Sequence, residues 1–539
     1  MRIRRSGPVV SAMLISTFIL HGHLLAQVPY QRILRADREP GNWLTYGGSY
    51  RSQRYSQLSQ INRDNVSQLK AAWVYQIRQA GIIETSPIVA DSVMYMTEPP
   101  STVTALDVRT GRPLWTYTPE IPKDVIVIGS PPVNRGVAIL DDTVFAGNVN
   151  GHLTALDAKS GAVRWDVTVE DNKKGYYLTL APLALDGKII VGVSGAETGI
   201  RGFVDAYDPK TGSRLWRTFT VPAHGEAGSE TWGQDSWKTG GGSTWLTGSF
   251  DPDLNLLYWG TGNPAPDWNG DERQGDNLYT CSVLALNPDN GKMKWYFQFT
   301  PHDVHDWDST ETPVLVDRTF KGETRKLMLH ADRNAFFYVL DRTNGKFLLG
   351  KPFARQTWAK GLDDSGRPVL VPNQEPTGEG NVSYPSMWGA TNWMSPSYDP
   401  ETGHLFITFR EFGDRYYKRH DEYKPGRVYM GGKTMPVEDQ EWGGVKAINA
   451  ETGNIDWEYK FYIGSLSAGV LATDGGVLFA ASRDGNLAGL DKRTGKLLWH
   501  FQTGAPIDSS PMSYAVDGTQ FVALSAGSVL YSFALPPTP

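Results

Sequence analysis

The chain has 539 residues, a formal net charge of −6, 57 glycines, 34 prolines and 12% aromatic residues. This composition excludes a helical bundle and an intrinsically disordered chain, and it is typical of many short strands joined by tight turns. The weak negative charge is spread along the chain without runs, which argues against nucleic acid or an anionic membrane as a partner.

The first 26 residues have the pattern of a secretory signal peptide. Three arginines among the first five residues precede an apolar stretch from about residue 8 to residue 20, and Ala26 offers a small residue for cleavage. An uncleaved membrane anchor is the alternative, but the stretch is short for a span and no later segment reaches transmembrane length. We therefore expect residues 1–26 to be removed and residues 27–539 to form a secreted, periplasmic protein without a transmembrane segment.

A nine-residue pattern recurs along the chain: Asp or Asn, then a glycine four residues later, then Trp four residues after the glycine. In each copy an apolar run leads into a turn where the acidic or amide side chain can bond turn amides and glycine can take a positive φ. The copy at Asp341 has Leu349 in place of Trp. The copies begin at Asp107, Asp157, Asp208, Asn287, Asp341, Asn449 and Asp491.

These hairpins, at a period near 50 residues, predict an all-β fold: a single eight-bladed β-propeller with one four-stranded sheet for each repeat. A Trp at one fixed place in each repeat predicts docking between neighbouring blades. The spacing of 108 between Gly345 and Gly453 predicts a missing copy near residues 398–406. Residues 43–73 should pair with residues 529–535, which removes the exposed sheet edges. A spacing of 79 predicts an inserted loop at residues 223–240.

The tryptophan-bearing turns resemble the docking motifs of the pyrroloquinoline-quinone (PQQ) dehydrogenases, the methanol and ethanol dehydrogenase family, from about Gly41 to Leu535. Three further segments carry a more specific resemblance, in the order of that family. They are Ser194-Gly195-Ala196-Glu197, Gly260-Thr261-Gly262-Asn263-Pro264 and Thr300-Pro301-His302-Asp303-Val304-His305-Asp306.

The resemblance implies that Glu197, Asn263 and Asp306 bind a metal ion. Their oxygen atoms are ligands for Ca²⁺ or a similar hard cation rather than for zinc. Taken singly, Glu197 could be a solvated loop residue and Asn263 an ordinary turn residue. His302 and His305 could form a zinc pair, but no third His or Cys lies in a suitable local pattern.

The resemblance also assigns residues to the cofactor. It implies that the quinone stacks on Trp245, that Arg333 donates a hydrogen bond to the reactive carbonyl, and that Asp306 takes the proton of the alcohol. Trp245 could otherwise be another core tryptophan. Polar contacts to the carboxylates and ring edge of PQQ are implied for Glu84, Arg135, Thr179, Ser194 and Asn392.

Two positions bear on the type of enzyme. Asp308 matches an aspartate of lanthanide-type methanol dehydrogenases, where calcium-type enzymes have a small neutral residue, and a third carboxylate suits a trivalent ion. Alternatively, Asp308 could bond backbone amides in a turn. Gly129 and Ser130 stand where the family commonly has two adjacent, disulfide-linked cysteines. Cys281 is the only cysteine, so the chain can form no internal disulfide and cannot attach haem through a pair of cysteines.

The function implied is oxidation of a primary or small alcohol to the aldehyde, with bound PQQ and a calcium or lanthanide ion. Electrons would pass to a separate acceptor such as a cytochrome c. Two other classes remain open at this point. A non-catalytic secreted propeller scaffold would explain the docking turns alone, and a propeller hydrolase or lyase would use the acidic residues without a quinone.

Overall fold

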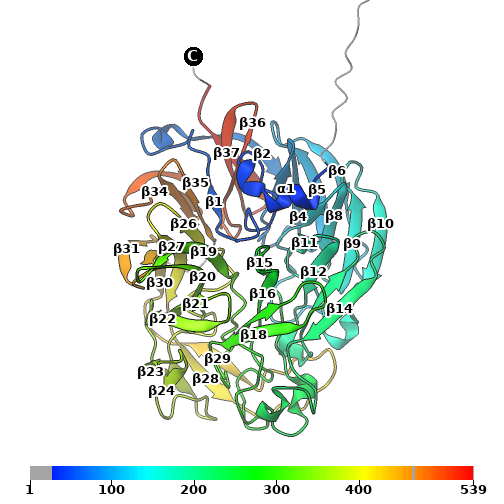
Figure 1. Ribbon diagram of the computed structural model, residues 1–539, viewed down its shortest axis with the longest axis vertical. Coiled ribbons are helices and arrows are strands. Elements are labelled where there is room, and N and C mark those ends of the chain that lie inside the picture. The colour runs from blue at the N-terminus through cyan, green and yellow to red at the C-terminus, as the bar shows by residue number, and fades with distance from the viewer. Residues whose placement is uncertain (1–26, 464–467, 538–539) are drawn as a thin grey trace, which may run out of the picture.

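The computed structural model describes residues 27–463 and 468–537, so the predicted signal peptide lies outside the described residues. These residues form an all-β structure of small antiparallel sheets, with only a five-residue α-helix, α1 (Tyr30–Leu34), and short 3₁₀ turns. Figure 1 shows the sheets following one another around the molecule in chain order. No helix among the described residues has the length and apolar character needed to cross a membrane.

The first four sheets have four strands each, in chain order. The first contains β3 (Ile88–Ala90), β4 (Val93–Glu98), β5 (Thr102–Asp107) and β6 (Pro113–Tyr117). The second contains β7 (Ala138–Leu140), β8 (Thr143–Gly147), β9 (His152–Asp157) and β10 (Val163–Thr168). The third contains β11 (Leu183–Leu185), β12 (Lys188–Gly192), β13 (Phe203–Tyr207) and β14 (Arg214–Phe219). The fourth contains β15 (Ser249–Asp251), β16 (Leu256–Gly260), β17 (Ser282–Leu286) and β18 (Met293–Gln298).

The next four sheets include strands from both ends of the chain. The fifth contains β19 (Val314–Phe320), β20 (Glu323–Ala331), β21 (Phe336–Asp341) and β22 (Lys346–Pro352). The sixth contains β26 (Ser397–Asp399), β27 (His404–Glu411), β30 (Trp442–Asn449) and β31 (Ile455–Lys460). The seventh contains β32 (Val470–Thr473), β33 (Val477–Ala481), β34 (Asn486–Asp491) and β35 (Leu497–Gln502), with β1 (Tyr55–Ser56) added in parallel. The eighth contains β36 (Met512–Val516), β37 (Thr519–Ala526), β38 (Val529–Ala534) and β2 (Lys70–Gln76).

Smaller strands and 3₁₀ turns lie between and beside these eight sheets. A hairpin of β23 (Ala359–Leu362) and β24 (Pro368–Leu370) follows the fifth sheet, and β25 (Asn381–Ser383) pairs with β28 (Asp414–Lys418), which pairs with β29 (Gly432–Pro436). The 3₁₀ turns are η1 (Ala36–Arg38), η2 (Val66–Gln68), η3 (Asn172–Lys174), η4 (Ala196–Thr198), η5 (Ser229–Thr231) and η6 (Ser236–Thr239). The last two lie in the stretch predicted as an inserted loop, between β14 and β15.

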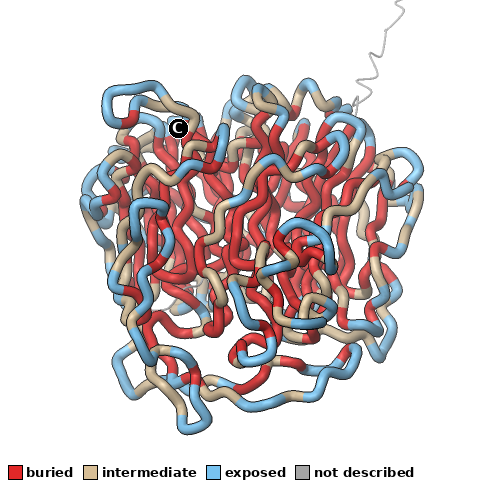
Figure 2. The backbone as a smooth tube through the Cα atoms, turned by 60° about the horizontal axis from the view of Figure 1, so that its bottom comes forward, coloured by how far each residue is buried: buried red, intermediate tan, exposed pale blue. Residues whose placement is uncertain are grey.

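Burial differs between the strands of one sheet. All residues of β8 are buried and four of the six in β9 are, whereas β10 at the outer edge has no buried residue. The inner strands lie between two neighbouring sheets, so both of their faces are buried away from water. Their sequences are therefore nearly continuous apolar runs. Figure 2 shows the same division, with buried strands inside and exposed loops at the periphery.

The recurring tryptophans dock neighbouring sheets, as the repeat predicts. The indole Nε1 of Trp165 donates a hydrogen bond to the carbonyl of Pro209 in the turn of the next repeat, at 3.0 Å. Gly212 of that turn lies against the ring, and a Cβ there would come within 2.9 Å of it. Glycine is therefore required for close approach as well as for its positive φ. The same contact joins Gly111 to Trp73, Gly161 to Trp115, Gly291 to Trp216, Gly345 to Trp295 and Gly495 to Trp457.

The prediction of a missing copy near residues 398–406 is wrong. A turn does join β26 to β27 there, but it connects the first two strands of the sheet, and its Gly403 lies against Arg318 instead of a tryptophan. The docking turn of this sheet begins at Asn449, between β30 and β31. The spacing of 108 instead reflects the smaller strands and loops inserted around the sixth sheet.

The sheet without a docking turn is the eighth, which joins the two ends of the chain. The predicted pairing is confirmed for β2, whose Lys70 lies opposite Ala534 of β38. Residue 43, at the start of the predicted segment, pairs instead with Val89 of β3 in the first sheet.

Candidate active site

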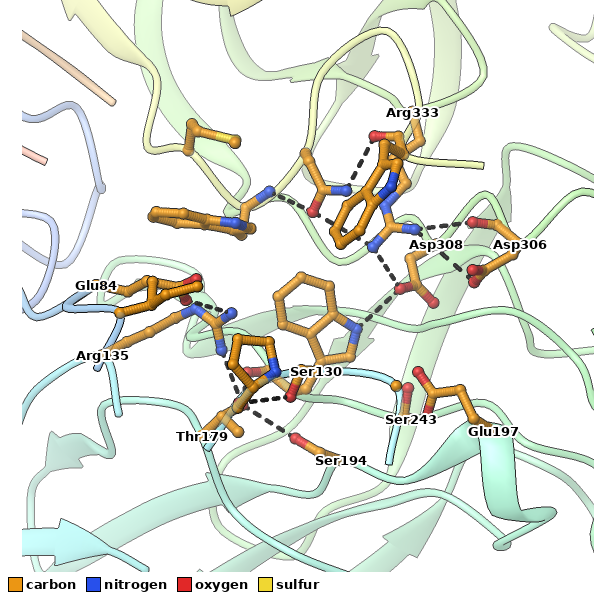
Figure 3. Close-up of a pocket in the computed structure, with 18 of the residues that line it drawn as sticks. Glu84, Ser130, Arg135, Thr179, Ser194, Glu197, Ser243, Asp306, Asp308 and Arg333 are labelled. Atoms are coloured by element: carbon orange, nitrogen blue, oxygen red, sulfur yellow. Dashed lines mark hydrogen bonds and ion pairs between the residues drawn. The ribbon is translucent and has the colours of Figure 1, made fainter. Parts of the chain in front are cut away.

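Ten of the eleven predicted site residues line one cavity of about 290 Å³. Figure 3 shows how the side chains that it labels among them face one another. They are Glu84, Arg135, Thr179, Ser194, Glu197, Trp245, Asp306, Asp308, Arg333 and Asn392. The eleventh, Asn263, is buried, and its backbone N–H donates a hydrogen bond to Asp308 Oδ1 at 2.7 Å.

The fold explains why residues so far apart in sequence meet. Glu84 and Arg135 lie in the segments that lead into the first strand of a sheet, whereas Ser194 and Asn263 lie in the segments that leave the second strand. Consecutive strands are antiparallel, so the start of the first and the end of the second lie at the same edge. The cavity is therefore built at one common edge of successive sheets.

One half of the cavity is organised by Arg135. Its guanidinium forms an ion pair with Glu84 at 2.6 Å and donates to Thr179 Oγ1 at 2.8 Å, and that hydroxyl lies 3.0 Å from Ser194 Oγ. The guanidinium also lies 4.7 Å from the ring centroid of Trp245. Burial raises the pKa of Glu84 to about 7 even though Arg135 opposes the shift. Guanidinium and hydroxyl groups at this place can bind the carboxylates of an anionic ligand.

Asp308 connects three elements in the other half. Its Oδ2 accepts a hydrogen bond from Trp245 Nε1 at 2.9 Å and forms an ion pair with Arg333 Nη2 at 2.9 Å, and its Oδ1 accepts a hydrogen bond from the backbone of Asn263. The hydrogen-bond and ion-pair partners of the Asp308 carboxylate are therefore not the backbone amides of its own turn. Arg333 is further held by the carbonyl of Asp306, at 2.8 Å.

Asp306 and Glu197 face the cavity without a direct cationic partner at bonding distance. The closest nitrogen of Arg333 is 3.8 Å from Asp306 Oδ1. Burial and the negative charge of Asp267 raise the pKa of Asp306 well above its usual range, and burial raises the pKa of Glu197 to about 7. Asp306 also has a φ of +63°, in the left-handed region of backbone conformation.

The backbone of Gly129 lies directly against the Glu197 carboxyl group. A Cβ at position 129 would be 2.1 Å from Glu197 Cδ, and the residue has a φ of +91°. Ser130 lies beside it on the cavity wall. A side chain at position 129 could not be added without moving the Glu197 carboxyl group.

Sequence reasoning missed Asp267, a fully buried acid in the loop between β16 and β17. Its Oδ1 accepts a hydrogen bond from Asn263 Nδ2 at 3.0 Å, while its Oδ2 is buried and accepts no hydrogen bond from the described residues. In the sequence Pro264-Ala265-Pro266-Asp267 this residue looks like an ordinary turn aspartate. Only the folded loop places it beside the other acids.

The chemistry of this half fits a hard cation. The available donors are carboxylate and amide oxygens, and Glu197 Oε2 and Asp267 Oδ2 are buried without a hydrogen-bond donor among the described residues. Buried carboxylate oxygens without donors are costly unless a cation neutralises them. His302 and His305 do not converge here: His302 lies 2.7 Å from the carbonyl of Gly275, and His305 stacks on Trp307.

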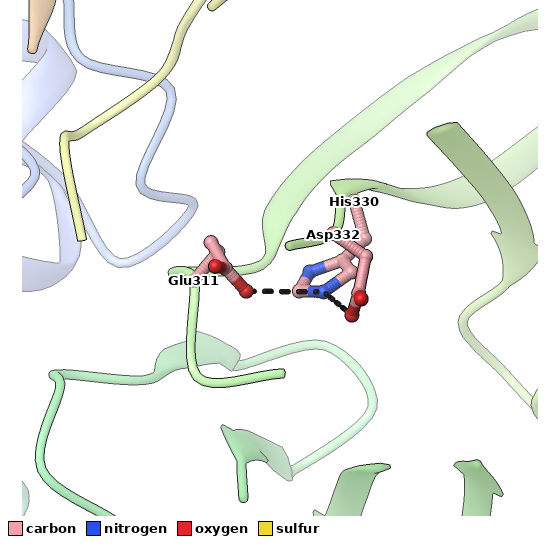
Figure 4. Close-up of side chains that lie close together, drawn as sticks. All are labelled: Glu311, His330 and Asp332. Carbon is pink, nitrogen blue, oxygen red and sulfur yellow. Dashed lines mark hydrogen bonds and ion pairs between the residues drawn. The ribbon is translucent and has the colours of Figure 1, made fainter. Parts of the chain in front are cut away.

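A second buried group, also missed from the sequence, lies next to Arg333, and Figure 4 shows its members Glu311, His330 and Asp332. His330 Nε2 is 3.1 Å from Asp332 Oδ2 and 3.7 Å from Glu311 Oε2. Glu311 Oε1 is 4.0 Å from Arg333 Nε. Burial and the neighbouring Asp332 raise the pKa of Glu311 well above its usual range.

Comparisons with known proteins agree with the sequence resemblance. The chain matches the family described as glucose/ethanol/alcohol dehydrogenase, β-propeller domain (PQQ), over residues 43–352 and 364–522. It is 39% identical to the quinoprotein alcohol dehydrogenase PedH of Pseudomonas putida, over 96% of this chain and 91% of that protein. It is 34% identical to a lanthanide-dependent methanol dehydrogenase of Methylacidiphilum fumariolicum, over 96% and 90%. A europium-containing methanol dehydrogenase structure superposes with a TM-score of 0.90 at 31% identity, over 94% of this chain and 100% of that one.

Proposed function

The chain belongs to the PQQ-dependent alcohol dehydrogenase family, and from this premise we propose that it oxidises a primary or small alcohol to the aldehyde in the cavity described above. PQQ and a calcium or lanthanide ion are the cofactors of this reaction. The observation that carries the proposal is the convergence of basic, aromatic and acidic side chains from separate sheets on one buried cavity. A scaffold without catalytic function has no need for such a set.

We assign the binding of PQQ to the half of the cavity around Arg135. Trp245 offers a flat ring for stacking and is held in place by its bond to Asp308. Arg135, Thr179 and Ser194 offer donors for carboxylates, and Asn392 lies 3.3 Å from Arg333 Nη2 at the other side. We assign the metal ion to the oxygen atoms of Glu197, Asn263, Asp306 and Asp308.

When bound, PQQ supplies the two-electron acceptor and the metal ion supplies positive charge that polarises it. The chain supplies the proton acceptor and the orientation. The nearest nitrogen of Arg333 is 3.8 Å from Asp306 Oδ1, which is beyond hydrogen-bonding distance, so this carboxylate is free to take the hydroxyl proton. Arg333 is fixed by Asp308 and by the Asp306 carbonyl, and it can donate a hydrogen bond to negative charge that develops beside Trp245.

The apolar part of the wall sets the class of substrate. Ile82, Pro131, Met387 and Trp388 line the cavity together with Trp393, and Trp388 is half exposed. Such a wall excludes water from the reacting alcohol and accepts an alkyl or aromatic substituent.

Three further parts of the proposal concern architecture and partners. The eight main sheets form the blades of one propeller built from residues 27–539, and residues 1–26 direct export to the periplasm. Electrons leave for a separate acceptor, which we propose to be a cytochrome c. A lanthanide is the preferred ion because Asp308 adds a carboxylate to the site.

Reconstitution of the purified chain with PQQ tests the proposal. Protein that receives PQQ together with Ca²⁺ or La³⁺ should show the absorption band of the bound quinone and should reduce a redox dye when a primary alcohol is added. Bound quinone without alcohol-dependent dye reduction under either ion would contradict the proposed reaction.

A further inference from the structure

Asp267 is an acidic residue of this region to which the resemblance assigns no role. It lies four residues after Asn263, and its side chain has no exposed surface. One carboxylate oxygen accepts the Asn263 Nδ2–H bond, and the other meets no donor among the described residues. Leaving a buried carboxylate oxygen unpaired costs free energy, so this oxygen points to a missing positive partner.

We propose that Asp267 is a further member of the cation site, which holds the Asn263 amide through Oδ1 and faces the ion with Oδ2. The inference rests on the proposed function, because it concerns the same metal ion. A carboxylate accepts hydrogen bonds only, so the group that Asn263 turns toward Asp267 must be its NH₂. The amide oxygen of Asn263 is thereby left free for the cation. A partner that orients a ligand in this way is a general feature of metal sites.

The charge of the cluster gives Asp267 a second role. Glu197, Asp267, Asp306 and Asp308 are four carboxylates, and among the described residues only Arg333 forms ion pairs with any of them. Four carboxylates beside one guanidinium, which also lies 4.0 Å from Glu311, leave an excess of negative charge that suits a trivalent ion better than Ca²⁺.

The guanidinium of Arg273 also lies near this loop, but it does not neutralise any of these carboxylates through an ion pair. Arg273 donates to the backbone carbonyls of Pro266, Asp267 and Asp303 and to the side chain of Asn277, not to a carboxylate. Arg273 therefore shapes the loop, and Asp267 is left to face the cation.

Ion affinity in the PQQ-loaded protein tests the inference independently of turnover. Tb³⁺ binding is measured by luminescence excited through tryptophan, and Ca²⁺ binding by competition. Asp267→Asn keeps the size of the side chain and an oxygen acceptor for Asn263 but removes the charge. We expect it to weaken Tb³⁺ binding about 10–100-fold, the usual effect of removing a supporting partner, and to weaken Ca²⁺ binding less.

The matched control is Asp271→Asn, in the same loop, whose carboxylate is exposed and paired with Lys418. This change should leave both affinities unaltered. Asp267→Ala, which also removes the bond to Asn263, should lose at least as much Tb³⁺ affinity as Asp267→Asn, and melting curves of both variants establish that they are folded.

The outcomes separate this inference from the proposed function. Wild-type protein that binds neither ion would overturn the metal site altogether. If Asp267→Asn binds Tb³⁺ as tightly as the wild type does, the role of Asp267 is overturned but the metal site is not. Equal losses for Tb³⁺ and Ca²⁺ would reject the charge argument.

Discussion

Replacing Trp165 with alanine should destabilise the fold by about 3 kcal/mol. The substitution removes the bond to the Pro209 carbonyl, worth about 1 kcal/mol, and the contact with Phe145 at 5.7 Å between ring centroids, worth about 0.5–1.5 kcal/mol. It also leaves a gap above Gly212. Truncation of a fully buried Trp costs about 3–5 kcal/mol, and the half-buried position of Trp165 places the effect at the lower end.

Denaturant unfolding followed by circular dichroism measures this loss in the free energy of unfolding. If refolding is incomplete, the unfolding rates of the variant and the wild type are compared instead. Tyr462→Ala is the control, because that side chain is 92% exposed and its removal should cost less than about 0.5 kcal/mol. A sharper comparison uses phenylalanine. Trp165→Phe loses a hydrogen bond, whereas Trp295→Phe does not, since the Trp295 indole nitrogen has no partner among the described residues. Equal costs at the two positions, or a Trp165→Ala effect as small as the control, would refute the docking argument.

Four changes test the cavity. Trp245→Ala should weaken PQQ binding strongly and leave the melting temperature of the cofactor-free protein nearly unchanged; titration of PQQ and a melting curve measure both, and the reverse pattern would make Trp245 a core residue. Asp306→Asn should keep PQQ bound while turnover falls by about 10²–10⁴-fold, and retained turnover in metal-saturated protein would remove Asp306 from the mechanism. Asp308→Ala should lower activity with La³⁺ more than it affects folding, and wild-type activity that is full with Ca²⁺ and unchanged by La³⁺ would contradict the preference for a lanthanide. Gly129→Ala should displace Glu197 and weaken metal binding in ion titrations, and an unchanged affinity for the metal ion would show that the segment around residue 129 can shift to make room for the added Cβ.

The repeated elements of the fold could be predicted because each copy carries its own local signal. Asp157, Gly161 and Trp165 occupy fixed places in a turn and strand, and the structure gives each the expected contact. The eighth sheet carries no such signal. Its third and fourth strands, β38 and β2, come from opposite ends of the chain, so no turn connects them and no motif is needed there. The even spacing of the other copies therefore predicts the missing one at the turn between β26 and β27, which is not a docking turn.

The candidate site divides in a similar way. Glu197, Asn263 and Asp306 stand in segments that resemble a known family, so they could be named from the sequence. Asp267 lies only four residues beyond Asn263, but its burial depends on how the loop between β16 and β17 folds back. Glu311, His330 and Asp332 were missed for a related reason. Glu311 lies before β19 and the other two lie at or directly after the end of β20, and no local pattern in the sequence relates these two places.

The pairing of β2 with β38 has a consequence for the synthesis of the protein. A ribosome makes the chain from its N-terminus, so β2 is exposed early and must wait until residue 534 has emerged before its partner strand exists. Until then one edge of β2 is open to pairing with another chain, as are the strands already made at the growing end. The sheet that combines both ends is thus assembled last, through contacts of very long sequence separation, which are slow to form. Conditions that delay the appearance of β36, β37 and β38 should therefore favour aggregation over native structure, even though most strands of the earlier sheets pair with their neighbours in the chain.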